Sequence, residues 1–236
     1  MGKQDRRVAA MMARNADFKK LMLREKSPFA IKEAYKALRT KVSFSLPGTG
    51  CKVIGLTSAN RSEGKSSTAV NLALSFAQIE KKVLLIDCDM RLPTVAGKLG
   101  LSNVPGLSDF LVGESDVGKI LRRAENGYFD VLPAGNIPPD ATGLLESDLM
   151  GELLTKLRER YQYIIIDLPP ILSVTDAAIL SRYIDGFLLV VRHESTEYRA
   201  VNEMLRQMRM AHAKILGFVY NDAPAMAKKY YSYYKK

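Results

Sequence analysis

Six short runs rich in β-branched residues and leucine recur from residue 51 onward, and most are separated by longer stretches with helical periodicity. The runs are Lys52–Thr57, Lys82–Ile86, Tyr128–Leu132, Tyr163–Ile166, Gly186–Val191 and Ile215–Tyr220. Most of them are continuously apolar, which is typical of strands buried on both faces. Helices are expected at Ser66–Gln78, Glu146–Arg160, Thr175–Tyr183 and Thr196–Met210. This alternation predicts an α/β fold with a mostly parallel β-sheet flanked by helices on both faces.

A further helix is expected before the first strand. Ser27 followed by Pro28 is typical of a helix start, with the serine hydroxyl as N-cap and proline at the first helical position. The breaker cluster at 47–50 ends this helix. We therefore divide the chain into a helical N-terminal extension at 1–47, one α/β domain at 48–222 and a C-terminal tail at 223–236.

Composition narrows the functional classes. Lys and Arg number 35 against 25 Asp and Glu, giving a formal net charge of +10, which favours an anionic partner. The basic residues are spread along the chain without a recognition motif, so we expect no nucleic-acid partner. No apolar run approaches the roughly 20 residues that a membrane helix needs. With only two cysteines, Cys51 and Cys88, the sequence is that of a protein expected in the cytoplasm.

The strongest chemical signal is the segment from Ala59 to Ser66, which follows a strand run and opens a helix. It matches the phosphate-binding pattern G-x-x-x-x-G-K-[ST] except that Ala59 replaces the first glycine. Backbone N–H groups at such a helix start face a bound phosphate, Lys65 reaches its oxygens, and the Ser66 hydroxyl is placed for Mg²⁺. The residues expected to bind the nucleotide here are Arg61, Ser62, Glu63, Gly64, Lys65, Ser66 and Ser67.

Carboxylates follow two of the apolar runs. Asp87 and Asp89 lie at the end of one, and Asp167 ends another, so all three are expected at the sheet edge where α/β proteins bind ligands. Each taken alone is equally well explained as a strand-ending aspartate that caps the next loop. Together with the phosphate loop they predict a site for Mg²⁺ and a nucleotide, with one carboxylate to spare as a general base.

These motifs, with 132–135 (Leu-Pro-Ala-Gly) and 174–177 (Val-Thr-Asp-Ala), resemble the bacterial tyrosine kinase family. The family consists of P-loop kinases with a partition-ATPase-like fold, and the resemblance implies ATP and Mg²⁺ as cofactors. It implies that Asp87 accepts the proton of the attacking tyrosine, assisted by Lys65 and Asp89. It also implies Mg²⁺ on Ser66, Asp89 and Asp167. Arg91 and Arg192 are candidate phosphate or substrate contacts, and Asn221 is either a contact to the base or part of a simple turn.

The resemblance extends to both ends of the chain. In the family a tyrosine-rich tail is phosphorylated in trans, and the corresponding residues here are Tyr230, Tyr231, Tyr233 and Tyr234. An inert, solvated terminus is the alternative reading of this tail. The family also carries a Glu-x-x-Arg-x-x-Arg helix that mediates ring assembly. This chain has Glu33, Lys36 and Arg39, and the lysine keeps the charge but loses the bidentate fork.

The resemblance therefore implies a protein tyrosine kinase that phosphorylates its own tail and regulates capsule or exopolysaccharide synthesis and export. The implied partners are further copies of itself, other protein substrates, and an activating membrane adaptor that holds it at the inner face of the membrane. The alternative is a partition- or division-type ATPase that assembles on DNA or membrane. Those ATPases place a signature lysine where this chain has Asn60, and nothing in their chemistry requires a tyrosine tail.

Overall fold

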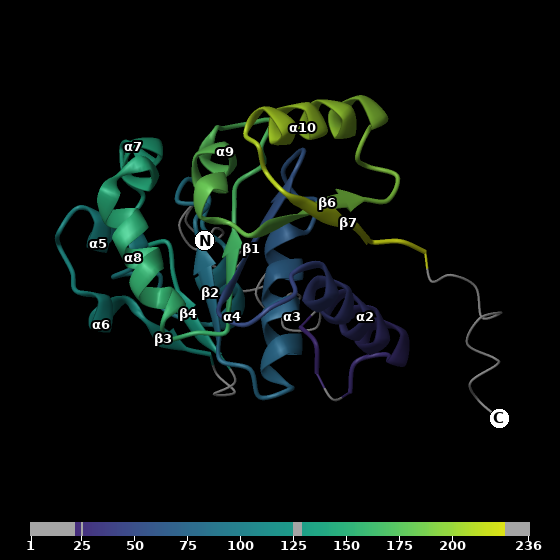
Figure 1. The fold of residues 1–236 in the computed structure, drawn as a ribbon, viewed down its shortest axis with the longest axis horizontal. Helices are drawn as coiled ribbons and strands as arrows, with labels where there is room; N and C mark the ends of the chain where they lie inside the picture. The colour runs from purple at the N-terminus through teal and green to yellow at the C-terminus, as the bar shows by residue number, and fades with distance from the viewer. Residues whose placement is uncertain (1–21, 25, 125–128, 225–236) are drawn as a thin grey trace, which may run out of the picture.

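The computed structural model describes residues 22–24, 26–124 and 129–224, and these form one seven-stranded sheet between two layers of helices (Figure 1). The strand order is β3-β4-β2-β5-β1-β6-β7, and only the β3–β4 pair is antiparallel. The strands are β1 (Lys52–Ser58), β2 (Val83–Asp87), β3 (Arg122–Arg123), β4 (Asp130–Leu132), β5 (Tyr163–Asp167), β6 (Gly186–Arg192) and β7 (Ile215–Asn221). The predicted fold class is confirmed.

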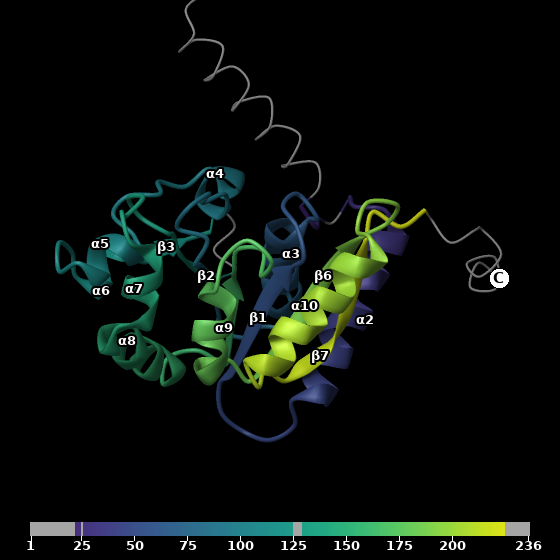
Figure 2. The ribbon, with the colours of Figure 1, turned by 90° about the horizontal axis from the view of Figure 1, so that it is seen from above.

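Helices cover both faces of the sheet, as Figure 2 shows from above. One face packs against α2 (Phe29–Ser45), α3 (Lys65–Ala77) and α4 (Val95–Leu99). The other packs against the remaining helices, namely α5 (Leu107–Leu111), α6 (Val117–Ile120), α7 (Ala141–Glu146), α8 (Asp148–Arg158), α9 (Asp176–Leu180) with a 3₁₀ turn (Ser181–Tyr183), and α10 (Tyr198–Met210). Each face therefore has its own apolar core, which explains why the strand runs are continuously apolar.

The register of the central strands sets the position of the site. Asp87 of β2 pairs with Asp167 of β5, and Leu56 of β1 pairs with the same Asp167. All three strands are parallel, so their carboxyl ends meet at one edge, and β1 continues there into the loop that precedes α3. The two aspartates predicted from separate motifs are thus neighbours.

The turn after β4 packs backbone against backbone on the start of α5. Leu107 N–H donates to the Pro133 carbonyl and Ser108 N–H to the Ala134 carbonyl, both at 2.8 Å. A Cβ on Gly106 would lie 2.3 Å from the backbone nitrogen of Gly135, so only glycine fits this crossing. The Leu-Pro-Ala-Gly segment is therefore a packing element of the sheet edge.

Some local expectations were wrong. Ser27 does not cap α2: its hydroxyl accepts from Arg24 N–H at 2.8 Å, Pro28 takes the N-cap position, and the helix begins at Phe29. The helix expected at Glu146–Arg160 is α8, which begins only at Asp148, because Ser147 is extended and separates it from α7, a helix that the sequence did not predict. The sequence also gave no sign of β3, since its two arginines carry no strand pattern.

Two further findings concern the termini and membranes. Within the described ranges, no helix is long and apolar enough to cross a membrane. The predicted N-terminal extension is described only from residue 22 onward, and the four tail tyrosines lie outside the described residues.

Candidate active site

The loop between β1 and α3 has the backbone of a phosphate-binding nest. Ser62 and Gly64 have positive φ angles of 64° and 95°, which alternate with ordinary conformations and turn successive N–H groups toward one side. A side chain at Gly64 would clash, because its Cβ would lie 2.0 Å from the Asn221 amide nitrogen. Lys65 then starts α3, so the loop and the helix N-terminus form one anion-binding surface.

Lys65 and Asp89 form an ion pair inside this site. Lys65 Nζ lies 2.9 Å from Asp89 Oδ2, and the side chains are only 11% and 8% exposed. Burial by itself lowers the pKa of Lys65, but the neighbouring carboxylates of Asp167 and Asp89 outweigh it and raise that pKa. The lysine is therefore fully charged, as neutralising phosphate oxygens requires.

Asp87 is completely buried and held by backbone donors. Its Oδ1 accepts from Asp89 N–H at 3.1 Å, and its Oδ2 accepts from Thr94 N–H at 3.1 Å and Val95 N–H at 3.0 Å. Burial, reinforced by the charge of Asp167, raises the pKa of Asp87 to about 8. A carboxyl group with that pKa can take up and release a proton near neutral pH.

Asp167 differs from the other aspartates of the site in its hydrogen bonding. Its side chain is fully buried, yet neither carboxylate oxygen has a hydrogen-bond partner of acceptable geometry among the described residues. Burial raises its pKa, while Lys65 and the nearby Ser66 hydroxyl lower it. An ionised carboxylate left without donors is strongly unfavourable unless a cation completes it.

Mg²⁺ fits this arrangement. The described residues contain no cluster of three or more His, Cys, Asp or Glu side chains arranged as a metal site. Mg²⁺ bound with a nucleotide needs fewer, because it takes one or two carboxylates and completes its octahedron with phosphates and water. Asp167 and Ser66 are suited to this role. Asp89 is engaged by Lys65 and by Leu92 N–H at 3.1 Å.

Two arginines expected as spare phosphate contacts are bound within the protein. Arg91 Nη2 donates to the Thr142 hydroxyl at 2.7 Å, and that hydroxyl donates to the buried Asp176 at 2.9 Å. Arg192 pairs with Asp222 at 2.8 Å and reaches the Ser62 carbonyl at 3.3 Å. Both guanidinium groups therefore support loops around the site.

The side chain of Glu63 is engaged by groups of the protein itself. It accepts from Asn60 N–H at 3.1 Å and from the Thr196 hydroxyl at 2.7 Å. Only its backbone remains for a nucleotide. Sequence reasoning missed Thr196, since no motif or periodicity connects residues so far apart in the chain.

The other predicted residues fall in two places. Arg61 and Ser62 are exposed on the loop, Ser67 is half-buried, and the Asn221 amide donates to the Glu63 carbonyl at 2.9 Å. Glu33 and Lys36 form an exposed ion pair on α2 at 2.8 Å. Arg39 of the same helix donates to the Ser75 carbonyl of α3 at 2.6 Å, so it fastens α2 to its own subunit.

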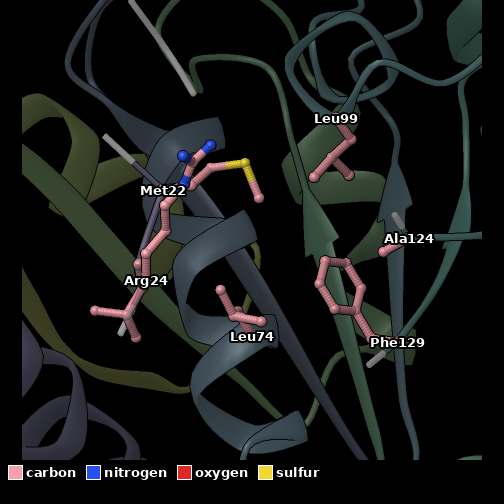
Figure 3. A pocket seen from close by; sticks show the side chains of 7 residues that line it. Met22, Arg24, Leu74, Leu99, Ala124 and Phe129 are labelled. Carbon is pink, nitrogen blue, oxygen red and sulfur yellow. The ribbon is translucent and has the colours of Figure 1, made fainter. Parts of the chain in front are cut away.

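An apolar pocket of about 330 Å³ lies elsewhere, between the segment at Met22–Arg24 and residues of α3, α4 and the β3–β4 region (Figure 3). Its lining consists of Met22, Leu23, Arg24, Leu74, Leu99, Ala124 and Phe129. Among these described residues Arg24 alone is charged, so the pocket offers no acid, base or nucleophile. The acidic residues and the lysine described above therefore lie outside this pocket, at the phosphate loop.

A mostly parallel sheet that carries a phosphate loop, its lysine and two strand-end aspartates at one edge defines a P-loop nucleotide-binding protein. A family model described as an AAA domain matches residues 51–217. Tyrosine-protein kinase YwqD of Bacillus subtilis is 38% identical over 202 residues, which cover 86% of this chain and 85% of the relative. This chain belongs to the bacterial tyrosine-protein kinase family, as the resemblance predicted.

Longer relatives and solved structures agree. Tyrosine-protein kinase wzc of Salmonella typhi is 37% identical over 205 residues, which are 86% of this chain but 28% of that relative's length. The kinase domain of Escherichia coli tyrosine kinase ETK superposes with a TM-score of 0.77 at 32% identity, covering 84% of this chain and 79% of that one. The septum site-determining protein MinD from Pyrococcus horikoshii, at 22% identity and a TM-score of 0.62, shares the fold alone.

Proposed function

We propose that the protein transfers the γ-phosphoryl group of ATP to tyrosines 230, 231, 233 and 234 of a second copy of itself. The observation that carries this proposal is the buried carboxyl group of Asp167, whose oxygens have no hydrogen-bond partner among the described residues, because a cation bound at the phosphate loop would compensate it. The tyrosine-rich tail at 228–236 supplies the acceptors. Membership of the kinase family supports tyrosine as the acceptor class.

Separate residues of the site would bind the phosphates, neutralise their charge and hold Mg²⁺. The nest at 61–67 and the N-terminus of α3 bind the phosphates of ATP. Lys65 exchanges Asp89 for phosphate oxygens and neutralises the charge that develops during transfer. Asp167 and Ser66, with Asp89 once it is released, hold Mg²⁺, which supplies Lewis-acid stabilisation of the phosphates when bound. Most of the catalysis is therefore positioning and electrostatics.

Asp87 is the proposed base. A tyrosyl hydroxyl has a pKa near ~10 and is protonated at neutral pH, so it needs a proton acceptor as it attacks. The pKa of Asp87, raised to about 8, suits that acceptor better than an ordinary aspartate would. Its three backbone donors fix the orientation of the carboxylate.

The cellular role follows from the family. We propose that the chain works in the cytoplasm at the membrane, is activated by a membrane adaptor, and regulates capsule or exopolysaccharide synthesis. Residues 1–47, with Glu33, Lys36 and Arg39, are the proposed oligomer contact, and residues 223–236 the substrate tail.

The test is phosphopeptide mass spectrometry of the tail after incubation with ATP and Mg²⁺, with and without a candidate adaptor's cytoplasmic segment. Wild type is compared with Lys65→Met, Asp87→Asn and a matched surface control, Asp116→Asn. We expect tail phosphate in wild type and in the control but at least 100-fold less in the two site variants. Phosphate release without tail modification, stimulated by DNA or lipid, would instead support the ATPase switch.

A further inference from the structure

Three side chains at the carboxyl ends of β6 and β7 hold the phosphate loop from the side. Arg192 donates to the Ser62 carbonyl at 3.3 Å, Thr196 donates to Glu63 Oε1 at 2.7 Å, and Asn221 donates to the Glu63 carbonyl at 2.9 Å. We call these three residues the loop brace. They contact the loop at two consecutive residues, Ser62 and Glu63, which directly precede Gly64.

The carboxylate of Glu63 needs hydrogen-bond donors from the protein. A carboxylate in a loop that binds phosphates would repel the ligand if it faced the nest. Its side chain is instead buried at 1% exposure and surrounded by donors: Asn60 N–H at 3.1 Å, Asn60 Nδ2 at 3.3 Å and the Thr196 hydroxyl. The charge is therefore satisfied inside the protein and turned away from the nucleotide.

The Thr196 hydroxyl accepts one hydrogen bond and donates another. Its oxygen accepts from Arg192 N–H at 2.8 Å, and its single proton goes to Glu63, because a carboxylate can only accept. The hydroxyl thus connects the end of β6 to the loop. Among the described residues, Thr196 is the one donor to the Glu63 carboxylate that lies outside the loop.

We propose that Thr196 is a positioning residue for nucleotide binding. Through Glu63 it holds Ser62 and Gly64 in the left-handed backbone that points the loop N–H groups at the phosphates. The ligand concerned is the di- or triphosphate group of ADP or ATP, so this inference rests on the proposed function. It adds to that function a residue outside the phosphate-loop motif, at the start of the segment leading into α10.

The experiment measures binding of a fluorescent ADP analogue with Mg²⁺, together with KM for ATP and kcat for tail phosphorylation. The variants are Thr196→Val, which removes only the hydroxyl, and Thr196→Ser, which keeps it. Thr155→Val is the matched control, because the Thr155 hydroxyl bonds only the Gly151 carbonyl within α8. Thermal unfolding is recorded for every variant.

We expect Thr196→Val to raise both Kd and KM about tenfold, the size of one hydrogen bond to a charged group, with kcat changing less than threefold. Thr196→Ser and Thr155→Val should match wild type. If the valine variant does not fold, Thr196→Ala takes its place with the same expected rise. Wild-type affinity in the variants that lack the hydroxyl, or equal loss in Thr196→Ser, overturns the inference. A wild type that binds no nucleotide overturns the proposed function instead.

Discussion

At the scale of single residues, the site keeps charges that the free protein would be more stable without. Neither oxygen of the buried Asp167 has a hydrogen-bond partner among the described residues, and the carboxyl groups of Asp87 and Asp89 lie near the same lysine. Such an arrangement is costly in a folded protein and persists where a ligand compensates it. We therefore expect Mg²⁺ and nucleotide, when bound, to relieve this unfavourable electrostatic arrangement.

Neutralising Asp167 should stabilise the free protein and abolish its response to ligand. We expect Asp167→Asn to raise the free energy of unfolding without ligand by about 1–2 kcal/mol, because a buried unpaired charge is removed. The stabilisation that Mg²⁺ and ADP give wild type should disappear. Denaturant unfolding with and without Mg²⁺–ADP measures both effects, and Asp116→Asn serves as the control. A variant that is less stable than wild type would contradict the metal-site assignment.

The raised pKa of Asp87 gives a pH dependence of definite sign. A carboxyl group whose pKa is higher in the folded state than in the unfolded state binds more protons when the protein is folded. The free energy of unfolding therefore falls as pH rises. The window lies between the ordinary value near 4 and the folded value of about 8. The slope contributed by one proton is at most about 1.4 kcal/mol per pH unit.

We therefore expect the nucleotide-free wild type to lose stability from pH 4 to pH 8 more steeply than Asp87→Asn. Urea unfolding at several pH values checks this, and the difference in slope is the quantity to compare. The absolute stability of the variant is not a clean measure, because asparagine has one acceptor oxygen where the carboxylate has two, so Asp89 N–H on one side and Thr94 and Val95 N–H on the other cannot all be satisfied. Parallel pH profiles for the two proteins would show that Asp87 titrates normally.

At the scale of elements, the sequence predicts the strands that are set by a hydrophobic pattern. It does not predict the features that are set by tertiary contacts. The six apolar runs became six of the seven strands, and the strand-end aspartates fell at one edge because parallel strands require it. β3 could not be predicted, since pairing with β4 and not its own composition makes it a strand. The Thr196–Glu63 contact joins residues 133 positions apart, which no local pattern encodes.

The crossing of α5 and the turn after β4 provides a test at this scale. We expect Gly106→Ala to destabilise the protein by about 3 kcal/mol, because its methyl group would meet backbone atoms that cannot move aside. Gly118→Ala is the matched control: it lies in α6 with open space around it and should be neutral or stabilising by up to about 1 kcal/mol. Chemical denaturation gives the free energy of unfolding of both variants. A Gly106→Ala variant as stable as wild type would show that the turn can move to make room for the methyl group.

At the scale of the whole molecule, the proposed oligomer contact lies on α2, opposite the layer formed by α8 to α10. Arg39 is engaged with α3 of its own subunit, whereas the Glu33–Lys36 pair is exposed and available to a neighbour. An exposed pair of this kind contributes only a few tenths of a kcal/mol to the stability of one subunit. Its removal should therefore affect assembly far more than folding.

We expect Lys36→Glu to lower the mass of the oligomer in sedimentation velocity while thermal unfolding shifts by less than about 3 °C. Lys156→Glu, a change at an exposed position of α8 outside the proposed contact, provides the control for net charge. If both variants remain assembled like wild type, α2 is not the contact.

The position of Asn221 beside Gly64 has a geometrical consequence for that assembly. The last strand ends at the phosphate loop, and Tyr230 and Tyr234 follow Asp222 by eight and twelve residues. Fully extended, these lengths reach at most about 29 Å and about 43 Å. In the proposed reaction between two copies, each tail is attached beside its own phosphate loop and cannot reach farther than this length. A tail tyrosine can enter the active site of a neighbouring subunit only if that site lies within this distance. The length of the tail therefore sets an upper limit on the distance between subunits that phosphorylate one another.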